Sequence, residues 1–307
     1  MKSRTQEEAA DISMELAEVR PWGSGSRVGI IGGLGEMGRL FAKFFQDCDC
    51  HVEIADIGSQ RSNREVLQEA DIVLFAVPLH ETVSIIRELV PFVRSHQLLM
   101  DVTSLKVAPV GEMLRSPASV VGLHPMFGGR VATLAGQTLV ACPVRIAREQ
   151  WLPLRQTFVD AGMRVKECTP EEHDRMMSII QALFHMTTML MGRVLREMDV
   201  DIDATLEFTS PSYRLEMSQM GRMFAQSAAL YAAITQMNVN TAEILSLLKA
   251  GLEAYETWYR TQDLEAFMED FQQSAGHLGG FCQRAYRESS EILDFVVRLA
   301  QHPDGSV

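Results

Sequence analysis

The stretch RVGIIGGLGEMGRLF, Arg27 to Phe41, joins an apolar run to an amphipathic run through a glycine-rich turn. The apolar run predicts a strand, and the spacing of apolar residues after the turn predicts a helix. Glycines at such a junction permit a tight turn, close approach of the backbone to a pyrophosphate and close helix packing, while the helix N-terminus favours the anion. The stretch therefore predicts a dinucleotide-binding unit with cofactor-binding residues Gly33, Leu34, Gly35, Glu36, Met37 and Gly38.

The next predicted strand ends at a residue that indicates which dinucleotide binds. The run HVEIA, residues 51–55, is followed by Asp56, which lies 23 residues after Gly33. A carboxylate at this place can bind the ribose hydroxyls of NAD and would repel the 2′-phosphate of NADP. Arg61 leaves NADP as the alternative, because a guanidinium can bind that phosphate. The pattern favours NAD.

Short apolar runs alternate with helical patterns from Arg27 to Cys168. Several of these runs are apolar on both faces, as the strands of a parallel sheet covered by helices require. Such alternation predicts an α/β fold, with a Rossmann-type doubly wound sheet domain over residues 27–168. The expected strands are residues 27–31, 51–55, 72–77, 98–102, 119–123, 137–142 and 163–168.

The pattern changes after residue 168. In the segment TPEEHDRMM, Thr169 is the expected N-cap of a helix and Glu172 completes a capping box. This helix is expected to run to about Met198, and helical spacing of apolar residues continues beyond it. Residues 169–300 are therefore expected to form an all-α dimerisation and substrate domain, whose many methionines favour an adaptable core or a subunit interface.

Composition excludes several classes of protein. The formal net charge of −12 argues against a nucleic-acid partner, which needs clustered Lys and Arg. The longest uncharged run, residues 176–192, falls short of the ~20 apolar residues that a membrane span needs. Residues 1–26 and 301–307 are expected to be tails, the first mobile and without the features of a signal peptide. Five mostly scattered cysteines without a CxxC motif indicate reduced thiols in a cytoplasmic protein, and no metal site is expected.

Three further strand ends are expected at the edge of the sheet where the glycine-rich turn binds the cofactor, because ligands of open α/β sheets lie outside the carboxyl ends of the strands. The first carries Val77 and Pro78, which should border the cofactor. The second carries Thr103, Ser104 and Lys106 after the run LLMDV.

The third strand end, in VGLHPMFGG (residues 121–129), carries His124. Pro125 holds His124 in an extended conformation at the strand tip. A lone histidine at a strand end is usually structural, but one beside a nicotinamide site, a serine and a lysine is a candidate for proton transfer.

The helical half contributes three more candidates. His173 lies in the first turn of its helix, where capping is an adequate role. His185 lies in the uncharged run and is either a core histidine or part of a pocket wall. Arg214, after Pro211, suits bidentate binding of a carboxylate as well as it suits a surface salt bridge.

Several blocks carry a resemblance to a known family. The segments GGLGEMGRLF, VTSLK, GLHPMFG, EEHDRMMSIIQALFH and SPSYRLEMSQMGRMFAQSAALY resemble prephenate dehydrogenase, especially the dehydrogenase half of bifunctional chorismate mutase–prephenate dehydrogenases. The resemblance spans about Arg27 to Leu299. It implies NAD-dependent oxidative decarboxylation of prephenate to 4-hydroxyphenylpyruvate, in tyrosine biosynthesis, by an intertwined homodimer.

The resemblance also implies roles for single residues. His124 would draw the proton from the C4 hydroxyl of the substrate, and Ser104 would hold that hydroxyl. Arg214 would bind a substrate carboxylate and His185 would be a second pocket histidine. Lys106 and Tyr213 are further expected substrate contacts, and Thr103 is an expected cofactor contact.

Two departures from the family pattern leave the substrate open. Phe184 stands where the bifunctional relatives carry arginine, and Arg130 is the first charge after HPMFG. Arogenate and 4-amino-4-deoxyprephenate are the alternative substrates. A non-catalytic sensor of NAD or tyrosine is disfavoured by the joint presence of Ser104, His124 and Arg214. The SPSYRLEM block gives no support to a hydroxyisobutyrate- or pyrroline-carboxylate-type reductase.

Overall fold

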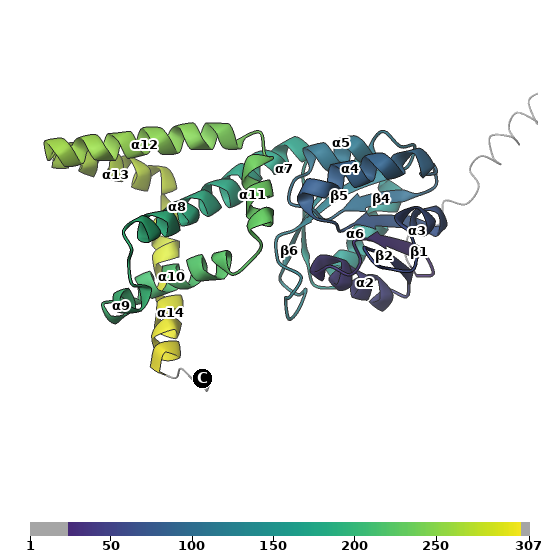
Figure 1. Ribbon diagram of the computed structural model, residues 1–307, viewed down its shortest axis with the longest axis horizontal. Helices are drawn as coiled ribbons and strands as arrows, with labels where there is room; N and C mark the ends of the chain where they lie inside the picture. The colour runs from purple at the N-terminus through teal and green to yellow at the C-terminus, as the bar shows by residue number, and fades with distance from the viewer. Residues whose placement is uncertain (1–23, 302–307) are drawn as a thin grey trace, which may run out of the picture. The chain divides into compact units, whose positions relative to one another are not determined.

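A computed structural model describes residues 24–301 (Figure 1). The chain forms two compact units that divide between Met177 and Ser178, and each unit is described by itself. Most of the two predicted tails, 1–26 and 301–307, lies outside the described residues.

Unit 1 is built on one seven-stranded sheet in the order β2-β1-β3-β4-β5-β6-β7. Neighbouring strands are parallel except β5 and β6, which are antiparallel. The doubly wound sheet predicted from the apolar runs is confirmed. The strands are β1 (Arg27–Ile31), β2 (His51–Ala55), β3 (Ile72–Phe75), β4 (Leu98–Asp101), β5 (Ser119–Pro125), β6 (Thr138–Arg145) and β7 (Arg164–Glu167).

Helices cover both faces of this sheet. On one face α2 (Glu36–Asp47) and α6 (Arg148–Asp160) bury aromatic side chains, and the rings of Phe44 and Phe158 stack with centroids 5.2 Å apart. On the other face lie α3 (Asn63–Glu69), α4 (Leu79–Leu89), the 3₁₀ turn η1 (Val90–Phe92) and α5 (Val107–Met113). Strands covered twice in this way are apolar on both faces, which is why they appear as continuous apolar runs in the sequence.

The strand register brings four chain segments to one edge of the sheet. Ile31 pairs with Phe75, Phe75 with Asp101, and Asp101 with Gly122. The glycine-rich turn, the turn after β3, the loop after β4 and the last residues of β5 therefore leave the sheet side by side. His124 lies two residues beyond Gly122, inside β5.

The boundary between the units lies later than the predicted change at residue 169. Helix α7 (Pro170–Met177) packs against α5 and β6 and belongs to unit 1. Its predicted N-cap is confirmed, because the Glu172 amide donates to Thr169 Oγ1 at 3.1 Å.

All regular elements in the described residues of unit 2 are helices, as predicted. It comprises the π-helix η2 (Ser178–Leu183), α8 (Phe184–Glu197), α9 (Ile202–Glu207), α10 (Pro211–Phe224), α11 (Ala228–Gln236), α12 (Thr241–Thr261), α13 (Leu264–Leu278) and α14 (Gly280–Gln301). None of the helices within residues 24–301 combines the length and apolar character needed to cross a membrane.

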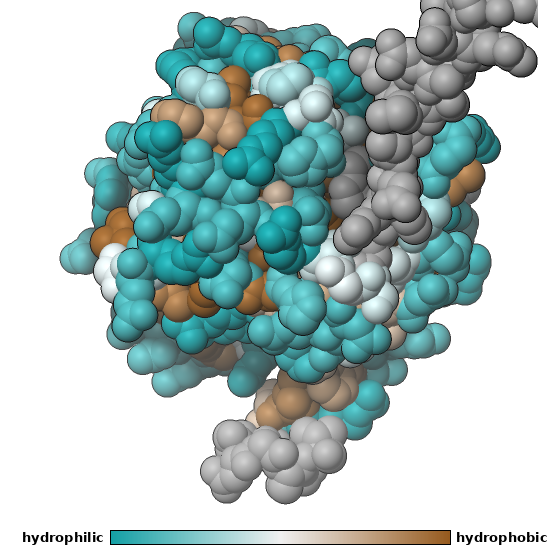
Figure 2. All heavy atoms as spheres, turned by 90° about the vertical axis from the view of Figure 1, so that its right-hand side faces the viewer, coloured by the Kyte–Doolittle hydropathy of each residue, from teal (hydrophilic) through white to brown (hydrophobic). Residues whose placement is uncertain are grey.

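Large apolar side chains are exposed on parts of the surface. The face shown in Figure 2 is mostly hydrophilic with small apolar patches. Unit 2 exposes large apolar side chains along its long helices, among them Tyr259, Leu264 and Phe271, which are 78%, 71% and 67% exposed. Exposed apolar surface on this scale is typical of an interaction face.

Candidate active site

The glycine-rich turn is shaped by close backbone contacts. Gly32 has φ +86°, and a Cβ there would lie 2.7 Å from the Ala76 carbonyl oxygen. A Cβ on Gly38 would collide with the Gly32 carbonyl oxygen, so α2 can pack onto the turn only with glycine at this position. No side chain caps the N-terminus of α2. The exposed turn and uncapped helix start fit the pyrophosphate of a dinucleotide.

Asp56 lies directly against this turn. Its Oδ2 accepts a hydrogen bond from the Leu34 amide at 2.8 Å, and its Oδ1 accepts one from the Ile57 amide at 2.7 Å. Arg61 was the residue that could have bound the 2′-phosphate of NADP. Its guanidinium is paired with the carboxylates of Glu69 at 2.5 Å and Glu53 at 3.5 Å. Two carboxylates thus hold the guanidinium, while the Asp56 carboxylate lies at the turn. This arrangement fits NAD.

The turn after β3 and the loop after β5 both contact the glycine-rich turn or its helix. A Cβ on Gly32 would lie 2.8 Å from Val77 Cγ1, so Val77 borders the turn, and Pro78 is the exposed residue before α4. Contact of these two residues with the cofactor stays a prediction. Arg130 pairs with Glu36 in the first turn of α2 at 2.6 Å. The loop that follows His124 is therefore anchored to the predicted cofactor loop.

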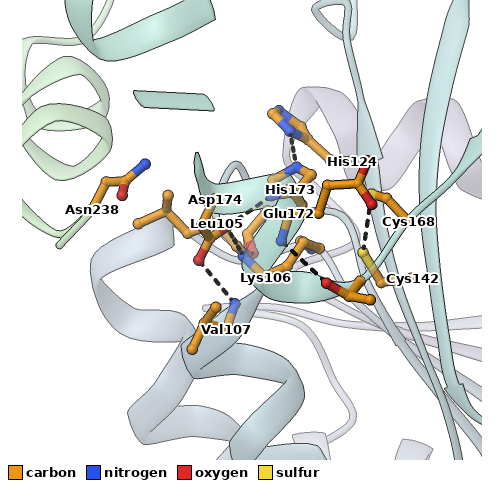
Figure 3. Close-up of polar contacts among 12 residues, drawn as sticks. Leu105, Lys106, Val107, His124, Cys142, Cys168, Glu172, His173, Asp174 and Asn238 are labelled. Atoms are coloured by element: carbon orange, nitrogen blue, oxygen red, sulfur yellow. Dashed lines mark hydrogen bonds and ion pairs between the residues drawn. The ribbon is translucent and has the colours of Figure 1, made fainter. Parts of the chain in front are cut away.

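His124 is buried, with 4% of its surface exposed, and it is connected to two residues of α7. Its Nδ1 lies 2.8 Å from Nε2 of His173, and Nδ1 of His173 lies 2.7 Å from Oδ1 of Asp174 (Figure 3). Burial lowers the pKa of His124 well below its ordinary value of 6.5, and the neighbouring basic groups of His173 and Lys106 lower it further. A histidine with a lowered pKa is neutral at pH 7 and can accept a proton.

Asp174 also fixes the start of α5. Its Oδ1 accepts the Lys106 amide at 2.7 Å and its Oδ2 accepts the Val107 amide at 3.0 Å. One carboxylate thus holds the N-terminus of a helix and the ring of His173, so the backbone of unit 1 determines where that ring lies.

Lys106 corrects a prediction. Its side chain is completely buried, and its ammonium pairs with Asp101 and donates to the Leu123 carbonyl at 2.6 Å. The expected contact between Lys106 and a substrate is therefore wrong. The lysine instead ties the end of β4 to β5 immediately before His124.

Thr103 and Ser104 differ in whether their side-chain hydroxyls are already hydrogen-bonded within the protein. Thr103 is 6% exposed, and its hydroxyl hydrogen-bonds to Asp101 and to the Leu105 carbonyl, so its side chain is unavailable as the expected cofactor contact. Ser104 is half-buried, and its hydroxyl makes no hydrogen bond to residues 24–301. Of these two neighbours, Ser104 is the one with a free polar group.

The remaining predicted residues belong to unit 2. The His185 ring meets Tyr231 edge to face at 4.8 Å, its Nδ1 is buried without a hydrogen bond to the described residues, and burial lowers its pKa. Arg214, half-buried on α10, takes part in none of the ion pairs among residues 24–301, which leaves its guanidinium available for a carboxylate. The Tyr213 hydroxyl donates to Thr205 Oγ1 at 3.0 Å.

The sequence pattern missed the role of His173. Helix capping was its expected role, whereas Thr169 caps α7 and His173 is 1% exposed and lies against His124. The two histidines are 49 residues apart in the chain. In the sequence around His173, the adjacent aspartate Asp174 was the only feature that could have indicated a role other than helix capping.

Comparison with known proteins identifies the family of this chain. The nucleotide-binding domain of prephenate dehydrogenase matches residues 48–166, and its dimerization domain matches residues 169–273. The T-protein of Haemophilus influenzae is 33% identical over 277 residues, which cover 90% of this chain and 73% of that protein. A probable arogenate/prephenate dehydrogenase of Methanocaldococcus jannaschii is 30% identical over 285 residues, covering 87% of this chain and 64% of that protein.

A solved structure has the same fold. The crystal structure of prephenate dehydrogenase from A. aeolicus, in complex with hydroxyphenyl propionate and NAD+, superposes with a TM-score of 0.63 at 17% identity. The match covers 83% of this chain and 99% of that chain.

Proposed function

Because this chain belongs to the prephenate dehydrogenase family and is an NAD-dependent dehydrogenase, we propose that it converts prephenate to 4-hydroxyphenylpyruvate by oxidative decarboxylation, a step of tyrosine biosynthesis. The observation that carries the proposal is His124, a buried neutral imidazole at the edge of the sheet that also carries the glycine-rich turn.

The residues divide the reaction between them. The glycine-rich turn would hold NAD, which when bound would supply the acceptor for a hydride from C4 of the ring. His124 takes the proton of the C4 hydroxyl, and Ser104 hydrogen-bonds the same oxygen. As the C4–H and O–H bonds break, a carbonyl forms at C4 and drives loss of CO2 from C1. The ring becomes aromatic, and the resulting phenolate oxygen takes the proton back from His124. Arg214 binds a substrate carboxylate, a task that suits a guanidinium with bidentate geometry. His185 and Tyr213 are further substrate contacts in this proposal.

Prephenate and arogenate both carry the hydroxyl, and the similarity to the T-protein favours prephenate.

A substrate panel tests the proposal. Formation of NADH is followed with prephenate, arogenate and 4-amino-4-deoxyprephenate, and kcat/KM is compared. We expect the highest value with prephenate. A higher kcat/KM with arogenate or 4-amino-4-deoxyprephenate would identify that compound as the substrate in place of prephenate. The absence of turnover with all three would contradict the proposed oxidative decarboxylation.

We also propose that the chain is a cytoplasmic homodimer formed through unit 2. An apolar groove of about 470 Å³ lies along α8 and α12, with Met186, Met189, Leu248 and Leu252 in its lining. A second copy would bury this groove and the exposed apolar side chains, consistent with the match of residues 169–273 to a dimerization domain. None of the five cysteines, all of which lie within residues 24–301, is in a disulfide, which fits a reducing compartment.

A further inference from the structure

Three buried side chains form a continuous hydrogen-bonded chain in unit 1. His124, His173 and Asp174 are 4%, 1% and 6% exposed, and the polar atoms that join them lie 2.8 and 2.7 Å apart. Figure 3 shows the His173 ring between the other two side chains. The members come from β5 and α7, so the fold brings them together.

The carboxylate determines the positions of the protons along this chain. Asp174 can only accept, so Nδ1 of neutral His173 carries the proton and its Nε2 carries a lone pair. That lone pair requires Nδ1 of neutral His124 to carry a proton. The second nitrogen of His124, Nε2, is then unprotonated and is the atom that can accept a proton from a substrate.

We propose that His173 and Asp174 are positioning residues that fix the proton-accepting tautomer of His124 and receive the proton onward from it. The proposal deepens the proposed function and rests on it for the identity of the proton donor. The substrate O–H bond breaks and a bond from the proton to His124 Nε2 forms. The Nδ1 proton of His124 moves to His173 Nε2, while Nδ1–H of His173 remains bonded to Asp174. The positive charge thus leaves His124 and comes to lie beside a carboxylate.

The charged groups around His124 support this transfer. Lys106 lies near His124 but is paired with Asp101, and it opposes a positive charge on that imidazole. His173 faces the Asp174 carboxylate directly. The Asp174 carboxylate therefore stabilises a positive charge on His173, whereas Lys106 opposes one on His124.

The tautomer can be measured without any substrate. We expect ¹⁵N NMR of histidine-labelled protein at neutral pH to show His124 protonated at Nδ1 and unprotonated at Nε2, with the signal assigned by its loss in His124→Asn. In Asp174→Asn we expect the His124 population to shift toward the Nε2-protonated form. Nε2 protonation in the unsubstituted protein would overturn the proposal. Because no turnover is involved, this result is independent of whether prephenate is the substrate.

Two substitutions of His173 separate positioning from packing. His173→Leu fills similar volume without an acceptor, whereas His173→Gln can offer an amide oxygen to His124 but cannot take a proton. With the best substrate of the panel, we expect kcat to fall ~10²- to 10⁴-fold in His173→Leu, less in His173→Gln, and not at all in the half-exposed control His80→Gln. Affinity for NAD should be unchanged in all three variants.

Discussion

At the scale of residues, the buried pair of Lys106 and Asp101 connects fold and site. Both side chains are fully buried, and the lysine also bonds to the carbonyl of Leu123, the residue before His124. Charges in such a place contribute through the position they impose on the backbone, because most of their mutual attraction offsets the cost of removing them from water.

Removing one partner of this pair should be costly. Lys106→Met leaves the Asp101 carboxylate buried without its cation, and we expect a loss of about 3–5 kcal/mol in the free energy of unfolding, measured with urea. The double variant Lys106→Met/Asp101→Asn, which removes both charges, should recover a large part of that loss. Equal losses in the single and double variants would contradict this interpretation.

Arg214 allows a kinetic test of substrate binding. Contact between the Arg214 guanidinium and a substrate carboxylate stabilises the ground state and the transition state alike. Arg214→Ala should therefore raise KM for prephenate and change kcat little. Arg222→Ala on the same helix is the matched control and should change neither. A fall in kcat at constant KM would assign Arg214 to the chemical step instead.

At the scale of elements, the contact between α2 and the glycine-rich turn sets the cofactor site. Gly38→Ala adds a methyl group that collides with the Gly32 carbonyl, so we expect weaker binding of NAD and lower stability. Gly111→Ala in α5, which meets nothing within 4 Å, is the control and should leave NAD binding unchanged. Equal NAD affinities of the two variants, measured by titration calorimetry, would show that the contact is unimportant.

Elements were also what the sequence pattern predicted best. The central strands β1, β3, β4 and β5 could be predicted because strands covered on both faces are apolar runs. Thr169 marked the start of α7 because an N-cap is a local feature of the sequence. Burial of Lys106 and the His124–His173 contact could not be predicted, since each depends on pairing between elements distant in sequence. The spacing of apolar residues in the sequence also could not assign α7 to unit 1, because the same helical spacing continues into unit 2.

At the scale of the whole molecule, the exposed apolar helices of unit 2 predict a dimer. Leu252 lines the groove of α12 and is 54% exposed, so Leu252→Arg should weaken association in sedimentation experiments. Leu152→Arg on α6 of unit 1, at a leucine that is 45% exposed, is the control and should leave the sedimentation coefficient unchanged. A monomeric unsubstituted protein would contradict the homodimer.

The central claim is that His124 accepts the proton in NAD-dependent oxidation of prephenate. The most direct measurement is kcat for NADH formation from prephenate by the unsubstituted enzyme and by His124→Asn, with NAD affinity determined for both. We predict that the substitution lowers kcat ~10²- to 10⁴-fold and leaves NAD affinity unchanged, because the asparagine cannot take the proton but does not alter the glycine-rich turn. Undiminished kcat in His124→Asn would contradict the account.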